Sequence, residues 1–563
     1  MLASDWLVQQ LVNNGLNVYF LVTGGAIVPF INSIAKHPDT EYYCFQHEQS
    51  AAMAAEGYFR ASGKIAVVCV TSGPGVQNLV NGVCGLWYDS VPGMFITGQV
   101  NSFESLENLA CKPRQSGFQE MPVVEMFKSV SKLSLQVTSL DELPRVIRRA
   151  VISLKTPRFG PVVIDLPVNV QMCSFSEVPK LLTSTGILRP STAKHDLGSL
   201  LKNSQRPLFI FGHGVKLAGC GSEAVACAEA MRIPFSLSWG AFDICASDHS
   251  LRVGSHGVYG DRVANYAVQN CDLLIMVGSR MDSRQTGGNL SMFSRFSKKV
   301  MVDIDREEML KLDEKGVTID YHVCEDARVF LENLIRTECD TEIWRIRINE
   351  WKSRFSTESA RSTDGAVYTY LEELFSNLPP DAIIVPDQGG NLIWTMQSAK
   401  IRSTQSLFTN FGNSSMGFAL PCAIGAAIAT KGQNPVYCID GDGGFQMNIQ
   451  ELLTVAKYNL QIHIIILNNS GYGIIKQFQD SYFSSNYVAT SKTDVFGDTV
   501  QFVKLAEAYG VQTLHDVAIP ETQKIYPKLE FGNSLENMSP YINFESHMIV
   551  DVPLKKAEGW KSN

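Results

Sequence analysis

Short hydrophobic runs, each followed by a glycine-rich or acidic turn and then by an amphipathic segment, recur along most of the chain. In the first third they are "VYFLV" (18–22), "IAVVCV" (65–70) and "GPVVIDLPVNVQ" (160–171). Buried strands that alternate with helical segments predict a parallel sheet covered by helices on both faces. The first third is therefore expected to form an α/β domain.

The same order returns twice further along the chain. The runs that carry it are "RPLFIFGHG", "CDLLIMVGSRMDSR" and "KKVMVDIDREE" in a second unit, and "DAIIVPDQGG", "NPVYCIDGDGG" and "IHIIILNNSGYG" in a third. A polar stretch that contains Pro179 and Pro190 predicts a linker between the first two units. We therefore predict an α/β protein of three doubly wound parallel-sheet domains, at residues 1–172, 186–340 and 360–545, with a C-terminal tail at 546–563.

The composition of the chain argues against some classes of binding partner. The net charge is −8 and no run of lysine or arginine occurs, which argues against nucleic acid or an anionic membrane. The thirteen cysteines are an odd number and never form C-x-x-C, as expected of reduced thiols in a cytoplasm. We find neither a secretory signal pattern nor an apolar run of the roughly 18 residues that span a bilayer. A cytoplasmic enzyme acting on small molecules is expected.

Two glycine-rich turns of the third unit carry the clearest candidate chemistry. "GDGG" follows "VYCID" and "NNSGYG" follows "IHIIIL", so both should lie at carboxyl ends of parallel strands, where α/β sheets bind ligands. One amphipathic helix, predicted to begin near Phe445 and to include Ala456, would point its N-terminus at a phosphate there. Asp442, Asn469 and a carbonyl near Gly471 would offer the oxygen ligands that Mg²⁺ or Ca²⁺ prefers. Turn chemistry alone favours two exposed turns instead.

The stretch from "GDG" (441–443) to "NN" (468–469) resembles the diphosphate-binding motif of thiamine-diphosphate enzymes, and "GDGGFQMNIQEL" is especially similar to acetolactate (acetohydroxyacid) synthase catalytic subunits. The likeness covers nearly the whole chain, including "HEQSAAMAAEGYFRASGK", "TSGPGVQNLVNGV", "GFQEMPVVEMFKSVSK" and "SMGFALPCAIGAAIA". It implies a pyrimidine-binding, a middle and a diphosphate-binding domain, with thiamine diphosphate and Mg²⁺ as cofactors. It also implies a homodimer or homotetramer with active sites at the subunit interface.

The resemblance assigns roles to individual residues. Glu48, in "HEQ", would stand against N1′ of the aminopyrimidine and promote the tautomer that activates the thiazolium, whereas composition alone favours a solvated glutamate at a helix start. Met416 would bend the cofactor, although a methionine is more often a core residue. The other expected contacts are Gly25, Phe118 and Gln119 near the reacting centre, and Gly75, Asn78, Gln388, Gly389, Gly441, Gly443 and Gly444 around the cofactor.

Loops of the middle unit resemble those that hold FAD in acetolactate synthases. They are "FGHG", "GSHG", "GSRMDSR" and "DID". The residues expected at the flavin are Gly212, Gly214, His256, Arg280, Asp282, Arg284 and Asp303. Glycine and acidic loops end strands in any α/β domain, so each motif is weak alone. The combined set implies an FAD with a structural role.

Four departures from the synthases gather on the side of the second substrate. "KPRQSGFQE" is shorter than the family's loop, Val168 replaces a lysine, Ser283 replaces an aspartate and Phe478 replaces a tryptophan. Loss of a cation and a changed aromatic wall should weaken selection of a carboxylate-bearing acceptor. We expect pyruvate as donor and, as in the related carboligases of branched-chain deoxysugar formation, a ketone or keto-deoxysugar nucleotide as carbonyl acceptor in place of a second 2-oxo acid.

Three alternatives remain open. A simple 2-oxo acid decarboxylase shares the cofactor, but that branch uses a histidine pair in the first domain, and no histidine occurs between His47 and His195. A flavin-dependent pyruvate oxidase is the oxidoreductase alternative. A non-catalytic scaffold would have no need of Glu48, Asp442 and Asn469 together.

Overall fold

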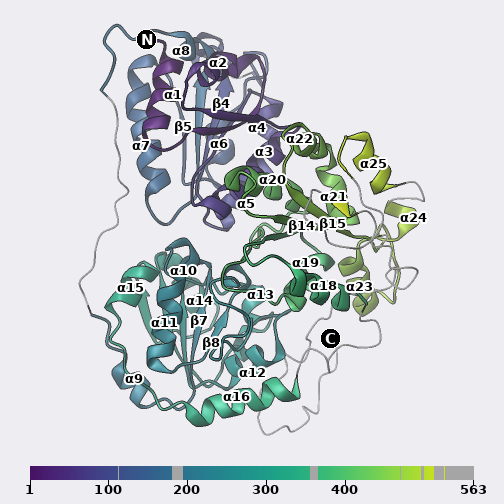
Figure 1. Ribbon diagram of the computed structural model, residues 1–563. Coiled ribbons are helices and arrows are strands. Elements are labelled where there is room, and N and C mark those ends of the chain that lie inside the picture. Colours follow the sequence, from purple (N-terminus) through teal and green to yellow (C-terminus); the bar gives the residue numbers. More distant parts are fainter. Residues whose placement is uncertain are drawn as a thin grey trace. The chain divides into compact units, whose positions relative to one another are not determined.

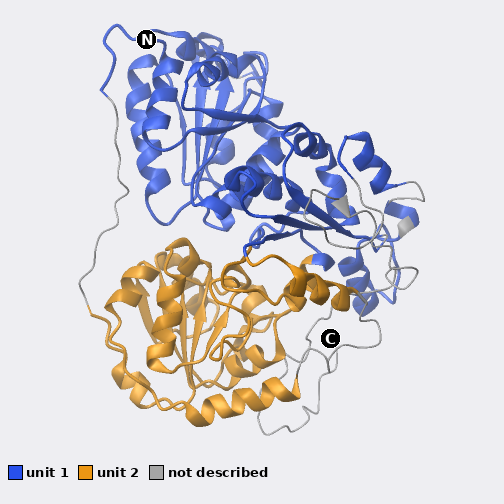
Figure 2. Cartoon of the chain, in the orientation of Figure 1, with its two compact units in different colours: residues 1–188, 381–391, 408–532 blue, residues 189–380, 392–407, 533–563 orange. Residues whose placement is uncertain are grey.

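The computed structural model describes residues 1–111, 113–180, 194–355, 366–469, 471–495, 500–512 and 525–526. The predicted tail at 546–563 and the boundaries predicted at 186, 360 and 545 lie outside these residues. The chain divides into two compact units (Figure 2). Unit 1 comprises residues 1–188, 381–391 and 408–532, and unit 2 comprises residues 189–380, 392–407 and 533–563.

Three global features can be compared with the expectations. Among the described residues, no helix is both long and apolar enough to span a bilayer. All thirteen cysteines are free, as expected of reduced thiols. The described part of the chain holds no group of three or more His, Cys, Asp or Glu side chains arranged for a metal ion. A metal site in that part would therefore need amide or carbonyl oxygens as well.

The N-terminal domain in unit 1 is built on one parallel sheet (Figure 1). Its strands are β1 (Val18–Val22), β2 (Glu41–Cys44), β3 (Val67–Val70), β4 (Gly93–Gln99), β5 (Leu133–Gln136) and β6 (Pro161–Pro167). Its helices are α1 (Ala3–Asn13), α2 (Val28–Lys36), α3 (Glu48–Ser62), α4 (Pro74–Asn78), α5 (Val80–Tyr88), α6 (Val123–Phe127), α7 (Leu143–Lys155) and α8 (Val168–Met172). The strand order is β2-β1-β3-β4-β6-β5, with every pair parallel.

Successive residues of these strands supply two different cores. Tyr19 packs into the core that includes Trp6 of α1, whereas Phe20 packs into the core that includes Ala51 of α3. Because side chains alternate across a strand, a sheet covered by helices on both faces needs strands that are apolar throughout. β3 and β4 are buried along their whole length. The predicted doubly wound sheet is confirmed.

The middle domain lies in unit 2. Its strands are β7 (Pro207–Phe211), β8 (Phe235–Leu237), β9 (Leu273–Val277), β10 (Lys298–Asp303) and β11 (Tyr321–Cys324), in the order β11-β10-β9-β7-β8 and all parallel. Its helices are α9 (Gly198–Lys202), α10 (His213–Leu217), α11 (Gly221–Met231), α12 (Arg262–Asn270), α13 (Ser283–Thr286), α14 (Arg306–Glu314), α15 (Ala327–Asn333) and α16 (Glu342–Arg354). The second predicted sheet is therefore confirmed.

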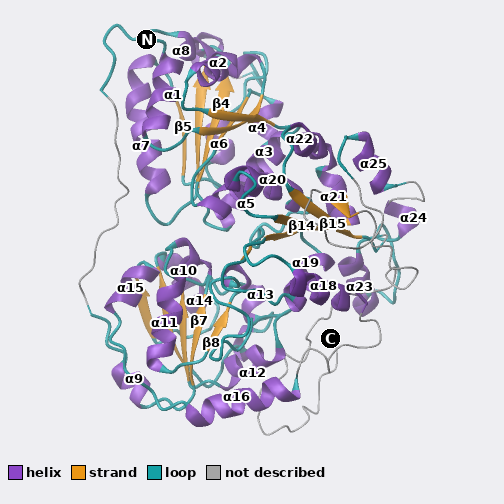
Figure 3. Ribbon diagram, viewed as in Figure 1, coloured by secondary structure: helices purple, strands orange, loops and turns teal. Residues whose placement is uncertain are grey.

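Figure 3 shows strands of the third sheet in orange. The sheet's strands β12 (Ile383–Pro386), β14 (Val436–Gly441), β15 (Ile462–Leu467) and β16 (Ile525–Tyr526) pair in parallel in that order. The glycine-rich turns come at the ends of β14 and β15. The other elements of this part of the chain are α18 (Ala366–Asn377), α19 (Gly390–Ser398), β13 (Ser406–Leu407), α20 (Ala419–Thr430), α21 (Asp442–Met447), α22 (Leu452–Lys457), α23 (Gly473–Tyr482), α24 (Lys492–Val495) and α25 (Phe502–Ala508).

The helix predicted after "GDGG" starts earlier in the structure than predicted and is interrupted. It begins at Asp442, three positions before Phe445, and α21 ends at Met447. A separate 3-10 turn and then α22 follow, so the single amphipathic helix was a wrong prediction. Asn448, at φ −134° and ψ 27°, interrupts the helix, and its side-chain amide donates to the Gly417 carbonyl at 2.7 Å. A tertiary contact of this kind leaves no trace in hydrophobic periodicity.

Within unit 1, α3 of the N-terminal domain packs closely on α20 of the C-terminal domain. A Cβ on Gly57 would lie 2.0 Å from the Cys422 carbonyl oxygen, and a Cβ on Gly425 would lie 1.9 Å from the Ala54 carbonyl oxygen. The two glycines therefore let the helix backbones approach directly. Both helices contribute to one hydrophobic core that is shared by the two domains. This contact brings the start of α3 toward the turns at the end of β14.

Candidate active site

Glu48 is the first residue of α3 and is buried at the carboxyl end of β2. Its Oε2 accepts a hydrogen bond from the Asn78 amide at 2.9 Å. A Cβ on Gly75 would lie 3.4 Å from the Glu48 Oε1, so the first turn of α4 leaves room for the carboxylate. The structure thus brings Glu48 together with Gly75 and Asn78, two predicted site residues of α4 that lie about 30 positions further along the chain. A buried carboxyl group beside an amide donor is suited to holding or passing a proton.

Two further loops meet the same strand ends. A Cβ on Gly24 would lie 2.5 Å from the Thr71 Cβ, and the Ala26 N–H donates to the Thr71 hydroxyl at 3.3 Å, which places the Gly25 turn beside the end of β3. A Cβ on Gly73 would lie 2.7 Å from the Gln119 Cβ. Gln119 adopts a φ of 64°, which is uncommon for a residue other than glycine.

Phe118, one position before Gln119, is much more exposed than Gln119. Its side chain is 85% exposed, so it takes no part in the protein core. The neighbouring Gln119 is half-buried against the Gly73 turn. The structure therefore places Gln119, but not the Phe118 side chain, within the group around Glu48.

The predicted metal-binding turns come together at the ends of β14 and β15. The Asp442 Oδ1 accepts from the Gly443 N–H at 2.7 Å, and its Oδ2 accepts from the Gly471 N–H at 3.0 Å. Asp442 and Asn469 are both buried. Gly471 has a φ of 154°, and a Cβ there would lie 2.4 Å from the Thr490 carbonyl oxygen, so only glycine fits. One carboxylate and one amide thus stand at adjacent strand ends, with oxygen donors of the kind that Mg²⁺ prefers.

The glycines of "GDGG" are tightly enclosed. A Cβ on Gly443 would lie 2.4 Å from the Tyr472 ring and 3.3 Å from the Met416 Cε. A Cβ on Gly444 would lie 2.1 Å from the Asp387 Oδ2 and 2.5 Å from the Asp440 Oδ1. Bare backbone is therefore presented at this turn, as a phosphate cradle requires.

The carboxylates beneath Gly444 serve the neighbouring loop. Asp387 accepts the N–H groups of Gly417 at 3.0 Å and of Ala419 at 3.1 Å, which fixes the start of α20 next to Met416. Burial raises the pKa of Asp387 to about 6, and burial next to Asp387 raises the pKa of Asp440 well above its usual range. This carboxyl pair therefore favours a state that retains a proton.

Gln388 and Gly389 follow directly at the end of β12. The Gln388 Oε1 accepts from the Ser414 hydroxyl at 2.8 Å, and its amide donates to the Thr409 hydroxyl at 2.8 Å. Gly389 has a φ of 89°, which glycine adopts at little cost. Gly441, the last residue of β14, lies beside Asn391, because a Cβ on it would be 3.7 Å from the Asn391 Oδ1.

Sequence reasoning missed the residues that join the two halves of the site. The Glu451 Oε1 accepts the N–H groups of Gln46 and His47, each at 3.1 Å. The Asn448 Oδ1 accepts from the Ser50 hydroxyl at 3.0 Å. These bonds hold the first turn of α3 against the segment that follows α21. Their only sequence signal was their position three to six residues beyond "GDGGF", which does not reveal a partner some 400 residues away.

The middle domain gathers its predicted loops at the carboxyl ends of β7, β9 and β10. A Cβ on Gly212 would lie 2.3 Å from the Gly278 carbonyl oxygen, and the Gly214 N–H donates to that oxygen at 2.8 Å. The Val258 N–H donates to the Arg284 carbonyl at 2.7 Å, which joins the loop of His256 to that of Arg284. The predicted flavin loops that follow β7 and β9 thus lie against each other.

His256 is a buried side chain of this group. Its Nδ1 lies 2.9 Å from the Ser236 hydroxyl, while its Nε2 is buried without a hydrogen-bond partner. Burial lowers the pKa of the imidazole to about 4, so the ring is neutral at neutral pH. An orphaned buried nitrogen at the ligand edge of an α/β sheet is a site at which a bound group can supply the missing partner.

The remaining predicted flavin residues lie nearby on the same loops. Asp282 caps α13 by accepting the Arg284 N–H at 2.9 Å, and the Arg284 guanidinium lies 5.9 Å from the Tyr259 ring centroid. The carbonyl of Arg280 accepts from Lys311 at 2.9 Å. Asp303 ends β10 and accepts the N–H of Asp305 at 2.9 Å. These contacts within the protein hold the loops in place without a ligand.

Comparison with known proteins places each of the three domains. Residues 1–126 match the family described as "Thiamine pyrophosphate enzyme, N-terminal TPP binding domain", residues 195–334 match its central domain, and residues 387–532 match its C-terminal TPP binding domain. The order of the three matches along the chain is that predicted from the sequence.

Similar curated proteins cover nearly the whole chain. Acetolactate synthase isozyme 2 large subunit of Escherichia coli is 32% identical over 98% of this chain and 96% of its own length. A probable acetolactate synthase large subunit of Methanocaldococcus jannaschii is 33% identical over 91% of this chain and 87% of its own length. The acetolactate synthase large subunit of Lactococcus lactis is 29% identical over 99% and 93%. Together with the three domain matches, these relatives show that the chain belongs to the thiamine pyrophosphate enzyme family and is acetolactate synthase-like.

Proposed function

We propose that this protein is a thiamine-diphosphate-dependent carboligase that decarboxylates pyruvate and transfers the two-carbon hydroxyethyl unit to a second carbonyl compound. The observation that carries the proposal is the pairing of two half-sites within unit 1. Asp442 and Gly471 join two adjacent strand ends, and Glu48 stands at the start of the helix that packs on the same domain. The relatives named acetolactate synthases support the carbon–carbon bond-forming class.

The cofactor's diphosphate and its metal fit the turns at β12, β14 and β15. Asp442 and Asn469 supply oxygen ligands for Mg²⁺, with a carbonyl near Gly471 as the third protein ligand. Gln388 lies at the same edge of the sheet, as do Gly389, Gly441, Gly443 and Gly444. Met416, next to Gly443, is placed to support the thiazolium ring.

Thiamine diphosphate, when bound, supplies the carbanion chemistry that breaks the bond to CO₂ and forms the new carbon–carbon bond. Glu48 holds a proton at N1′ of the aminopyrimidine, and the Asn78 amide fixes the direction of its carboxyl group. Gly75 keeps the space in front of Glu48 open, and Gly25 and Gln119 would line the reacting centre, whereas the exposed Phe118 would reach a reacting centre only across the subunit interface. Burial of Glu48 keeps bulk water from competing for its proton.

FAD fits the loops of the middle domain. The close approach of Gly212 to Gly278 leaves backbone exposed to a ligand, and His256 offers an unpartnered Nε2. Gly214, Arg280, Asp282, Arg284 and Asp303 complete the set. We propose that a flavin bound there has a structural role. A purified protein with a flavin absorption spectrum that pyruvate does not bleach without oxygen supports this role, whereas bleaching would favour the pyruvate oxidase alternative.

The acceptor is proposed to be a ketone or a keto-deoxysugar nucleotide. Val168 begins α8 where the related synthases have a lysine, so no cation faces an acceptor carboxylate from that position. Phe478 lies on α23, directly after the metal turn, and its ring is 4.7 Å from that of Tyr482 and 5.9 Å from that of Phe483. Phe478 and Tyr482 are more than half exposed, as is Phe483. An exposed aromatic wall suits the apolar face of a cyclic acceptor better than a small carboxylate.

The acceptor proposal has a direct test. The enzyme is supplied with pyruvate, with and without a cyclic ketone or a keto-sugar nucleotide, and the products are identified. A mixed tertiary alcohol supports the proposal. Acetolactate as the sole product in both reactions would show that the acceptor is a second pyruvate, and acetaldehyde alone would favour a simple decarboxylase.

We further propose a cytoplasmic homodimer or homotetramer in which Glu48 serves the cofactor of the partner subunit. The N-terminal and C-terminal domains are separated along the chain by the whole middle domain. The contacts of Glu451 and Asn448 with α3 lie within one chain, so the proposal of a shared site rests on the resemblance to acetolactate synthases.

A further inference from the structure

Three charged side chains are buried together in the N-terminal domain, outside the site described above. Arg60 donates to Glu56, four positions earlier on α3, at 2.6 Å, and to Asp89, directly after α5, at 2.7 Å. All three side chains are 3% exposed or less. Burial raises the pKa of Glu56 to about 7, against the opposing effect of Arg60. Burying such a charged cluster costs free energy. Apolar residues of similar size in its place would often stabilise a fold equally well or better.

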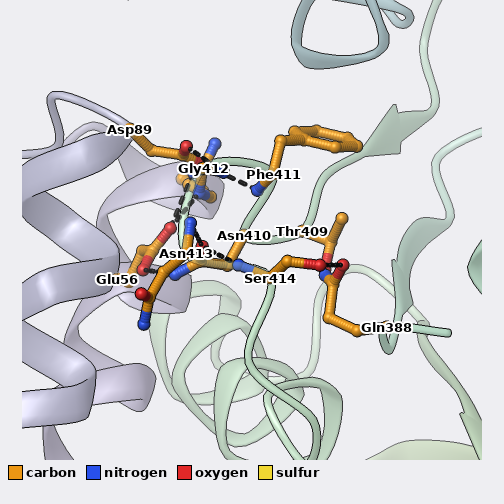
Figure 4. Close-up of polar contacts among 10 residues, drawn as sticks. Glu56, Asp89, Gln388, Thr409, Asn410, Phe411, Gly412, Asn413 and Ser414 are labelled. Atoms are coloured by element: carbon orange, nitrogen blue, oxygen red, sulfur yellow. Dashed lines mark hydrogen bonds and ion pairs between the residues drawn. The ribbon is translucent and has the colours of Figure 1, made fainter. Parts of the chain in front are cut away.

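The other lone pairs of the two carboxylates hold the C-terminal domain. The Asp89 Oδ2 accepts the Phe411 N–H at 3.0 Å, and its Oδ1 accepts the Gly412 N–H at 2.7 Å (Figure 4). The Glu56 Oε2 accepts from the Asn410 amide at 3.4 Å. Charged acceptors on consecutive backbone N–H groups fix a loop in position as well as in conformation.

That loop, residues 409–415, reaches the proposed diphosphate cradle on its other side. The Asn410 Oδ1 accepts the N–H groups of Asn413 at 2.9 Å and Ser414 at 3.2 Å. The Ser414 hydroxyl then donates to Gln388 at 2.8 Å (Figure 4). Ser414 adopts a φ of 57°, a conformation that costs free energy for a residue with a side chain. The bonds to Asn410 and Gln388 keep it there, and Met416 follows two positions later.

A glycine on α5 makes room for this link. A Cβ on Gly85 would lie 2.1 Å from the Asn410 Nδ2 and 3.2 Å from the Glu56 Oε2. Because Gly85 has no side chain, the side chain of Asn410 fits against α5 at this position. The loop is thus accommodated by shape as well as by charge.

We propose that Glu56, Arg60 and Asp89 are positioning residues that hold the loop at 409–415 in the conformation which presents Gln388 and Met416 to the cofactor. None of the three charged residues touches the cofactor site itself. Docking of the N-terminal domain would then complete the cradle of the C-terminal domain, and cofactor affinity would depend on carboxylates outside the cradle. The inference rests on the proposed function, because Gln388 and Met416 are assigned to the cofactor there.

The test measures the affinity of the full-length apoprotein for thiamine diphosphate with Mg²⁺ by titration calorimetry. Asp89→Asn retains the size of the side chain but replaces one acceptor oxygen by a donor group that faces other donors. We expect its dissociation constant to rise by about tenfold to a hundredfold. Hydrogen exchange of the Phe411 and Gly412 amides should accelerate in the same variant. Unchanged affinity and unchanged exchange would overturn the proposal.

Two further variants separate positioning from simple loss of stability. Ser414→Ala breaks only the link from the loop to Gln388, and it should weaken cofactor binding without lowering the unfolding temperature appreciably. Phe30→Leu reduces the core on the other face of the N-terminal sheet, which is formed by residues of the N-terminal domain, and should lower the unfolding temperature while cofactor affinity is kept. Wild-type affinity in Ser414→Ala, or a matching loss of affinity in Phe30→Leu, would contradict the proposal.

The same titration distinguishes the failure of this proposal from the failure of the proposed function. If the wild-type protein does not bind thiamine diphosphate, the proposed function fails. If the wild type binds the cofactor and Asp89→Asn and Ser414→Ala bind it equally well, only the positioning role fails.

Discussion

The Glu48 carboxylate and the Asn78 amide, thirty positions apart in the sequence, are joined by a hydrogen bond of 2.9 Å. Glu48 begins α3 after β2 and Asn78 ends α4 after β3, so the bond links the segments that follow the two strands on either side of β1. A buried carboxyl group that must exchange a proton with a ligand needs a fixed direction. The Asn78 amide supplies that direction from the protein side.

Replacement of Glu48 by Gln removes the titratable proton but retains the shape of the side chain and its amide partner. We expect CO₂ release from pyruvate to fall by about a hundredfold to ten-thousandfold, the usual range for a lost acid–base group. The dissociation constant of thiamine diphosphate should change much less. Glu125→Gln, at an exposed position on α6, is the matched control and should retain full activity. Full CO₂ release by Glu48→Gln would mean that another group carries the proton.

Mixed dimers test whether one active site uses two subunits. Glu48→Gln and Asp442→Ala should each be inactive alone. If Glu48 serves the partner's cofactor, co-expression of the two variants creates dimers with one intact site, and about a quarter of wild-type activity should return for random pairing. If each site is formed within one chain, the mixture remains inactive, and the shared-site proposal is wrong.

Gly471→Ala should damage the metal site through the backbone. A side chain at φ 154° is strained, and its Cβ would lie 2.4 Å from the Thr490 carbonyl oxygen, so the turn must move away from Asp442. We expect the concentration of Mg²⁺ needed for half-maximal activity to rise at least about tenfold. Gly63→Ala is the control, because Gly63 also has a positive φ of 69° but has no atom within 4 Å of its Cβ position. A similar Mg²⁺ requirement in both variants would argue against the assigned site.

Asp165 should make the stability of the N-terminal domain depend on pH. Burial raises the pKa of its carboxyl from 3.8 to about 7, although Gln99 and Thr97 donate to it. Between about pH 4 and 7 the folded protein keeps a proton on Asp165, whereas the unfolded chain has lost it. The free energy of unfolding therefore falls as the pH rises through that window.

The variant Asp165→Asn does not titrate at this position. The stability difference between wild type and Asp165→Asn should therefore shift in favour of the variant as the pH rises from about 4 to 7, by up to about 1.4 kcal/mol per unit of pKa shift. Unfolding temperatures measured across this range provide the check. Thr97→Val keeps the carboxyl group but removes a donor that lowers its pKa, so the pH dependence should persist and extend to higher pH. A difference between Asp165→Asn and wild type that stays constant with pH would show that Asp165 does not titrate in this window.

Local sequence patterns were sufficient for the sheets and for the residues at strand ends. Asp442 and Asn469 were predicted to converge because parallel strands end at one edge, and β14 and β15 are indeed neighbours. The break of the helix after Met447 was missed, because a tertiary hydrogen bond from Asn448 decides where the helix ends. The buried cluster around Arg60 was missed as well, since charged residues on a helix are usually solvated. The loop that Asp89 binds lies more than 300 residues further along the chain.

The central claim is that the protein forms a carbon–carbon bond from pyruvate. The most direct test supplies pyruvate labelled with ¹³C at its keto carbon, together with thiamine diphosphate, Mg²⁺ and the acceptor panel, and follows the label by NMR. The account predicts that the label appears in the new acetyl group attached to a carbinol carbon, with CO₂ released. Label found only in acetaldehyde or acetate, with every acceptor unchanged, would contradict it.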